Sequence, residues 1–130
     1  MQEPDSYVDQ LAHELIGAAI EVHRHLGAGY LESVYEEALA RELGQRDIKF
    51  QRQHPISVSY EGKKVGEGRI DLLVENKLVI ELKTVDNFSP IHTAQVISYL
   101  KSLDLRLGLL LNFKTATLRD GIKRVVYTNR

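Results

Sequence analysis

The chain has 130 residues, of which 43% are hydrophobic and 27% charged, with a net charge of −1 at pH 7 and no cysteine. The absence of cysteine excludes disulfides, thiolate metal sites and a cysteine nucleophile, and the near-zero charge argues against a protein that coats nucleic acid through bulk positive potential. No run of apolar residues is long enough to span a bilayer, so we expect one soluble domain over residues 1–130.

Two helices are predicted at the start of the chain. Apolar residues recur at helical spacing over residues 6–26, where Ser6 with Asp9 forms a capping signal and Gly27 a terminator. A second helix is predicted over residues 31–43, ended by Gly44. Its predicted inner face consists of Leu31, Val34, Tyr35, Ala38 and Leu39.

Strands are predicted next, because the apolar periodicity changes to two. One half-buried strand contains residues 48–50, and a second follows Pro55 with Ile56, Val58 and Tyr60 alternating with polar neighbours. Residues 61–64 predict a turn, and the glycines in the sequence "GEGR", residues 66–69, predict a bend or a β-bulge.

The stretch "IDLLVENKLVIELK", residues 70–83, predicts a β-hairpin of two apolar strands around a turn at residues 75–77. Such a turn pairs Val74 with Leu78, and the alternation of side chains then places Asp71 directly opposite Glu81. Their Cβ atoms would be about 5 Å apart, at which like charges destabilise a sheet unless something lies between them.

A third helix is predicted from Ser89, as the N-cap, and Pro90 to about residue 102. Two further strands follow, over residues 105–113 and in the final sequence "IKRVVYT", residues 122–128. This order of elements predicts an α/β fold, an α/β/α sandwich with a central mixed β-sheet.

The charged residues of the hairpin can be interpreted in two ways. A divalent cation between Asp71 and Glu81 would remove their repulsion, and Lys83, on the same face as Glu81, could stabilise negative charge on a phosphodiester undergoing hydrolysis. Alternatively, the side chains form a ladder of ion pairs on an exposed sheet face, in which Arg69 lies opposite Lys83. The hairpin alone does not decide between them.

The spacing of Asp71 and the sequence Glu81-Leu82-Lys83 across a hairpin resembles the PD-(D/E)xK nuclease superfamily. A second motif, "GYLESVY", has Gly29, Glu32 and Tyr35 at the spacing that gives the GxxExxY protein family its name, and this family is a small-domain branch of that superfamily. The resemblance extends over nearly the whole chain and implies a restriction-endonuclease-like core: two N-terminal helices, a β-hairpin, a helix and two further strands.

The resemblance also implies roles for individual residues. Mg²⁺ or Mn²⁺ would be the cofactor, as expected where hard oxygen ligands replace thiolates. Gln95 and Tyr99 are similar to the QxxxY element of recombination exonucleases. The implied catalytic residues are Asp71, Glu81 and Lys83; the implied metal ligands are Glu32, Asp71, Glu81 and the backbone carbonyl of Leu82; and the implied substrate-binding or supporting residues are Tyr35, Gln95 and Tyr99.

We therefore expect a metal-dependent nuclease that acts on nucleic acid, DNA rather than RNA, without a membrane partner. Two alternatives are a catalytically weak or inactive nuclease-fold module that binds nucleic acid or has a regulatory role, and a structural homo-oligomeric domain in which the charges form ion pairs. A homodimer is a further expectation, because small domains of this kind commonly dimerise to engage a duplex. The acidic N-terminal sequence "MQEPDSYVDQ" lacks the features of a secretory signal, so a cytoplasmic location is expected.

Overall fold

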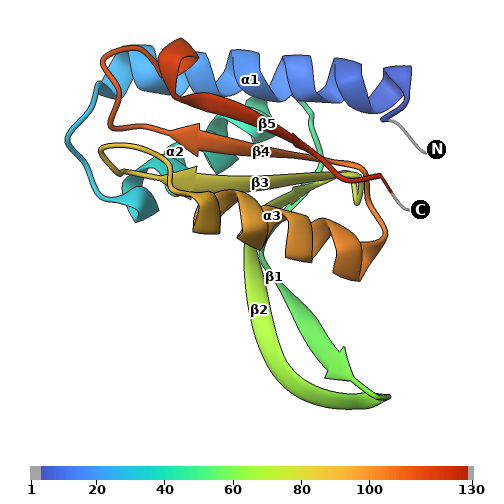
Figure 1. Ribbon diagram of the computed structural model, residues 1–130. Helices are drawn as coiled ribbons and strands as arrows, with labels where there is room; N and C mark the ends of the chain where they lie inside the picture. Colours follow the sequence, from blue (N-terminus) through green and yellow to red (C-terminus); the bar gives the residue numbers. More distant parts are fainter. Residues whose placement is uncertain (1–3, 129–130) are drawn as a thin grey trace.

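Helices cover both faces of a five-stranded sheet in residues 4–128, the part of the chain that the computed structural model describes (Figure 1). The elements are α1 (Ser6–Leu26), α2 (Glu32–Gln45), β1 (Phe50–Tyr60), β2 (Lys63–Val74), β3 (Leu78–Lys83), α3 (Pro90–Leu103), β4 (Leu107–Asn112), the 3₁₀ helix η1 (Leu118–Gly121) and β5 (Ile122–Val126). The strand order is β1-β2-β3-β4-β5, with β3 and β4 parallel and the other neighbours antiparallel. The predicted α/β fold with a mixed sheet is confirmed.

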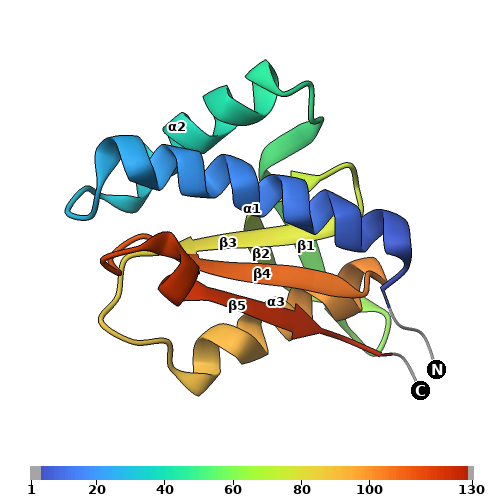
Figure 2. The ribbon, with the colours of Figure 1, turned by 90° about the horizontal axis from the view of Figure 1, so that it is seen from above.

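Two layers of helices enclose the sheet. α1 and α2 lie over one face and α3 lies under the other (Figure 2).

No helix described between residues 4 and 128 is long and apolar enough to cross a membrane.

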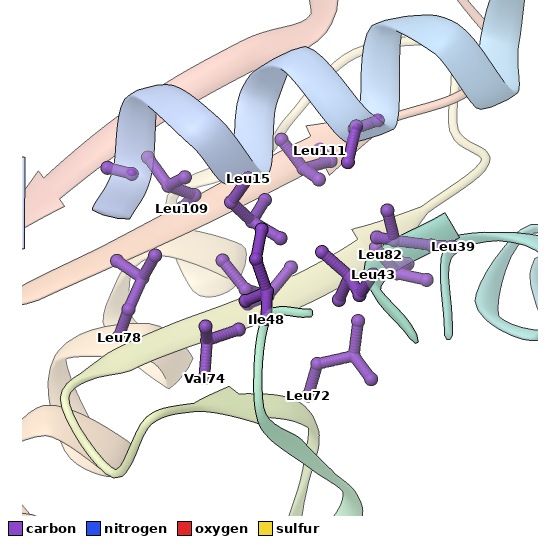
Figure 3. Close-up of a cluster of buried hydrophobic side chains, with 14 of the residues drawn as sticks. Leu15, Leu39, Leu43, Ile48, Leu72, Val74, Leu78, Leu82, Leu109 and Leu111 are labelled. Atoms are coloured by element: carbon purple, nitrogen blue, oxygen red, sulfur yellow. The ribbon is translucent and has the colours of Figure 1, made fainter. Parts of the chain in front are cut away.

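The larger hydrophobic core lies between the sheet and the helices α1 and α2. It is built from every second residue of the central strands and from one face of each helix. Part of this cluster is drawn in Figure 3: Leu15, Leu39, Leu43, Ile48, Leu72, Val74, Leu78, Leu82, Leu109 and Leu111. A smaller cluster, which includes Val79, Val96 and Leu110, joins α3 to the opposite face.

The start of α1 differs from the prediction. Ser6 is the first helical residue, and Asp5 is the N-cap, with its Oδ1 accepting a hydrogen bond from the amide of Val8 at 2.9 Å. A carboxylate at this position both satisfies a free amide and interacts favourably with the helix dipole. Gly27 ends the helix as predicted, with φ at 69°.

The end and the inner face of α2 also differ from the prediction. Gly44 does not end the helix, which continues to Gln45, and the Arg46 amide donates to the carbonyls of Glu42 and Leu43. Leu31 precedes the helix as its N-cap and is 75% exposed, and Val34 is 38% exposed. The helix is rotated relative to the predicted face, so that its buried residues are Tyr35, Leu39, Ala40 and Leu43.

The β2–β3 hairpin has the predicted register. Leu72 pairs with Ile80, Leu73 with Val79 and Val74 with Leu78, which leaves residues 75–77 as the turn. The number of turn residues and the alternation of buried side chains together fix this register.

The β1–β2 hairpin is longer than predicted and extends beyond the helices (Figure 1). One continuous strand replaces the two predicted around Pro55, because β1 is an edge strand and tolerates a residue without an amide hydrogen. Val58 and Tyr60 are 44% and 66% exposed rather than half-buried, since no helix covers this part. The register shifts between Val58 and Ser59, opposite Gly66, as expected for the predicted bulge.

Close packing of α3 on the sheet depends on Gly108 in β4. A Cβ atom there would lie 2.6 Å from Val96 Cγ1, which belongs to a fully buried side chain. We expect Gly108→Ala to lower the free energy of unfolding by about 1–3 kcal/mol, measured by urea denaturation. Gly66→Ala is the control, because a Cβ atom at Gly66 would have no neighbour within 4 Å. Equal effects of the two substitutions would contradict this packing.

Candidate functional site

Two carboxylates bridge β2 and β3 where the backbone ladder between these strands ends. The last paired residues are Leu72 and Ile80, one step before the predicted pair of Asp71 and Glu81. The amide of Asp71 donates to Glu81 Oε2 at 2.8 Å, and the amide of Leu82 donates to Asp71 Oδ2 at 2.8 Å. Each carboxylate therefore accepts a hydrogen bond from the backbone of the opposite strand, which fixes the two side chains close to each other.

Glu81 and Lys83 lie on the face of the sheet that α3 covers. Glu81 alternates with Leu82 and so shares this face with Val79, which packs in the cluster beneath α3. Lys83 Nζ donates to Gln95 Oε1 of α3 at 3.4 Å. The structure therefore brings together Asp71, Glu81, Lys83, Gln95 and, one helical turn after Gln95, Tyr99.

The two carboxylates cannot both be charged without cost in the absence of a cation. Glu81 is only 3% exposed, and burial together with the charge of Asp71 raises the pKa of its carboxyl to about 8. Burial also raises the pKa of Asp71, although hydrogen bonds from the Leu82 amide and the Gln53 side chain oppose this shift. Burial, followed by the charge of Glu81, raises the pKa of the Tyr99 hydroxyl, which keeps it protonated.

The donor atoms at this site match the chemistry of a hard cation. The carboxylates of Asp71 and Glu81 supply oxygen ligands, and no hydrogen bond among the described residues reaches Glu81 Oε1. Oxygen ligands of this kind suit Mg²⁺ and Mn²⁺. The oxygen atoms of this pair thus suit the kind of metal that the sequence implies.

Glu32 lies near this pair but does not join it. It is the exposed first residue of α2, and its charge makes the smallest of the contributions that raise the pKa of Glu81. Among residues 4–128, no three His, Cys, Asp or Glu side chains form a group that could hold a metal ion. The four predicted metal ligands are therefore only partly brought together.

The alternative of an ion-pair ladder is not observed. No ion pair in the described part of the chain joins Asp71 or Glu81 to Lys83 or Arg69. Arg69 instead donates to the backbone carbonyl of Gln53 at 3.2 Å. The charges of the hairpin are thus not explained by mutual neutralisation.

Sequence reasoning missed two residues next to Asp71. Gln53 Nε2 donates to Asp71 Oδ1 at 3.3 Å and to Glu36 Oε1 at 2.7 Å. For Glu36 a signal exists in the sequence, because it lies one helical turn after Glu32. For Gln53 there is none, because only the folded hairpin places it between the pairs Arg52–Leu72 and His54–Ile70, across from Asp71.

Tyr35 is a supporting residue of the loop before α2. Its side chain is fully buried, its ring stacks on Phe113 with centroids 4.4 Å apart, and its hydroxyl donates to the Gly27 carbonyl at 2.5 Å. The same hydroxyl accepts from the Tyr30 amide at 3.3 Å. A fully buried side chain cannot contact substrate, so only the supporting role fits this position.

Removal of the Tyr35 hydroxyl should weaken this loop. We expect Tyr35→Phe to lower the free energy of unfolding by about 1–2 kcal/mol, because the carbonyl of Gly27 and the amide of Tyr30 lose their partner. Thermal denaturation measures the effect, and Tyr30→Phe, at a ring that is 49% exposed, is the control with little change. A Tyr35→Phe protein as stable as wild type would contradict this role.

A groove of about 700 Å³ leads away from the site between α3 and the outer part of the β1–β2 hairpin. Gln95 and Tyr99 line it on one side and Ser57 and Ser59 on the other. Its volume lies within the range of roughly 300–1,000 Å³ that is typical of pockets for small ligands. The residues beside Lys83 are therefore accessible from a groove that could hold part of a larger ligand.

The comparison with protein families finds one match over most of the chain. The model described as "PD-(D/E)XK nuclease superfamily" matches residues 9–125, a span that contains every residue of the candidate site. No curated protein matches the sequence.

A comparison with solved structures supports the predicted restriction-endonuclease-like core. The structure described as "Crystal structure of SSO0001" matches with a TM-score of 0.57 and 18% sequence identity, over 75% of this chain and 50% of that one. The chain thus spans half the length of this relative. At this identity the likeness concerns the fold alone.

Proposed function

The chain belongs to the PD-(D/E)XK nuclease superfamily, and on that premise we propose that it is a metal-dependent nuclease that hydrolyses phosphodiester bonds in nucleic acid. The observation that carries this proposal is the pair of crossed hydrogen bonds that holds the carboxylates of Asp71 and Glu81 together, at 2.8 Å each. Nucleases of this superfamily generally use Mg²⁺ or Mn²⁺.

Within the superfamily, we assign the chain to the GxxExxY branch, as a single nuclease-like domain over residues 1–130. Two features of the motif support this assignment. Gly29 has a φ of 115°, which favours glycine, and Tyr35 anchors the loop between Gly27 and Tyr30. The motif thus shapes the chain just before Glu32.

Asp71, Glu81 and the Leu82 carbonyl would hold the cation, with Glu32 as an additional acidic residue nearby. When bound, a divalent cation polarises a phosphate oxygen and lowers the pKa of a coordinated water. The chain itself supplies the crossed hydrogen bonds that orient the two carboxylates before any ligand arrives. Such preorganisation reduces the reorganisation that binding would require.

Lys83 would stabilise the negative charge that develops on the phosphate. Its ammonium group is oriented by Gln95 at 3.4 Å and lies on the same face as Glu81. Gln95 and Tyr99 also line the groove. Either side chain can therefore donate a hydrogen bond to another phosphate of the bound nucleic-acid strand. The similarity of these two residues to recombination exonucleases favours DNA over RNA as the substrate.

A panel of nucleic acids tests this function. Single- and double-stranded DNA and RNA of the same sequence are incubated with the protein in Mg²⁺, Mn²⁺ or EDTA, and the products are resolved on denaturing gels. We expect cleavage of DNA that depends on the metal and stops in EDTA. Binding of these nucleic acids without cleavage under any condition would favour the alternative, an inactive module that binds nucleic acid.

A further inference from the structure

The backbone of β1 has an unusual conformation opposite Asp71. Gln53 has a φ of 49°, in the left-handed region, between residues that pair regularly: Arg52 with Leu72 and His54 with Ile70. A residue other than glycine rarely adopts this conformation within a strand, and such strain persists only where neighbouring contacts hold it.

The left-handed conformation of Gln53 allows two consecutive side chains of β1 to contact the same residue of α2. Consecutive side chains of a regular strand point to opposite faces, yet Arg52 and Gln53 both contact Glu36. Arg52 Nε donates to Glu36 Oε2 at 3.1 Å, and Gln53 Nε2 donates to Glu36 Oε1 at 2.7 Å. The backbone at Gln53 is also held from the other strand, because Arg69 donates to its carbonyl.

This arrangement directs the Gln53 amide toward Asp71. The 3.3 Å contact with Oδ1 complements the Leu82 amide on Oδ2, so both oxygens of Asp71 accept a hydrogen bond. The Glu36 carboxylate can only accept hydrogen bonds, and its side chain is 13% exposed. The amide group of Gln53 lies between this carboxylate and the like charge of Asp71 and donates to both. The contacts form one connected path from α2 through β1 to the carboxylate on β2.

We infer that Gln53, anchored by Glu36, is a positioning residue that holds the Asp71 carboxylate in the orientation that binds the divalent cation. The inference rests on the proposed function to the extent that Asp71 is a metal ligand. Partners that orient metal ligands commonly change metal affinity by about 10–100-fold when they are removed.

Gln53→Asn tests this inference, because asparagine tolerates the left-handed backbone and keeps the amide but is one methylene shorter. Binding of Mn²⁺ is measured by isothermal titration calorimetry without nucleic acid, together with the melting temperature. We expect the Mn²⁺ dissociation constant to rise about tenfold at an unchanged melting temperature. Gln51→Asn, the same substitution on an exposed side chain two residues earlier in β1, is the control and should match wild type.

A double-mutant cycle tests the role of Glu36. If Glu36 acts through Gln53, Glu36→Ala raises the Mn²⁺ dissociation constant of the otherwise wild-type protein. The same substitution in the Gln53→Asn protein then causes no further rise. Additive effects would overturn the anchoring role and make Glu36 an independent contributor. A Gln53→Asn protein that binds Mn²⁺ as tightly as wild type would overturn the whole inference.

The titration also separates this inference from the proposed function. A wild-type protein that binds Mn²⁺ but cleaves no nucleic acid would contradict the proposed nuclease activity. A tenfold loss of Mn²⁺ affinity in Gln53→Asn would still support the role of Gln53 in positioning Asp71. A wild-type protein that binds no Mn²⁺ would overturn both.

Discussion

Replacement of Lys83 by alanine is expected to lower the rate of Mn²⁺-dependent cleavage at least about 100-fold, the usual cost of removing one donor that stabilises transition-state charge. Lys83 makes no ion pair within the described residues, and its hydrogen bond to Gln95 at 3.4 Å leaves the ammonium able to reach a phosphate. Single-turnover cleavage at saturating Mn²⁺ measures the effect.

Two controls make this loss interpretable. Lys77→Ala removes an exposed lysine from the turn at the opposite end of the same hairpin and should leave the cleavage rate unchanged. Calorimetric titration of Lys83→Ala should show Mn²⁺ binding close to that of wild type, because Lys83 is not a ligand. A cleavage rate of Lys83→Ala equal to that of wild type would show that Lys83 has no catalytic role.

Replacement of Glu81 by glutamine is expected to stabilise the metal-free protein at pH 8. The pKa of Glu81 is raised from 4.5 to about 8 in the folded state, so the folded protein binds this proton more tightly than the unfolded chain. The resulting stabilisation is complete below pH 4.5 and is lost as the pH rises toward 8. Glutamine cannot ionise but keeps an oxygen that can accept from the Asp71 amide.

The expected gain in the free energy of unfolding is roughly 2–4 kcal/mol at pH 8 and below about 1 kcal/mol near pH 5. Urea denaturation in EDTA at both pH values measures it. Glu67→Gln is the control, because the pKa of this exposed glutamate is lowered by its hydrogen bond to Lys64 and the substitution should not stabilise the protein at pH 8. An equal difference between Glu81→Gln and wild type at both pH values would show that ionisation of Glu81 is not the cause.

Much of the hairpin that carries the site follows from the sequence. The alternation of buried residues and the turn at residues 75–77 fix the register, because a slip by one residue would move every apolar side chain to the wrong face. The register places Asp71 beside Glu81, and the family motif directs attention to Glu32. These features depend on the spacing of residues within short segments, which can be read from a single sequence.

The contacts around Asp71 depend instead on tertiary structure. The left-handed backbone at Gln53 breaks the alternation on which strand prediction relies, so no periodic pattern indicates that Gln53 and Arg52 share Glu36. The rotation of α2 about its axis is set by packing of Tyr35 on Phe113, a residue far along the chain. Helical periodicity alone therefore assigned Leu31 to the wrong face.

The central claim is that Asp71 and Glu81 form the cation site of a nuclease, and Glu81→Gln tests it most directly. This variant is expected to be more stable than wild type without metal, and urea denaturation at pH 8 checks that a loss of activity does not arise from unfolding. The measurement is the initial rate of DNA cleavage at pH 8 as a function of Mn²⁺ concentration, for both proteins. The account predicts metal-dependent cleavage by wild type and none by Glu81→Gln; equal rates for the two proteins would contradict it.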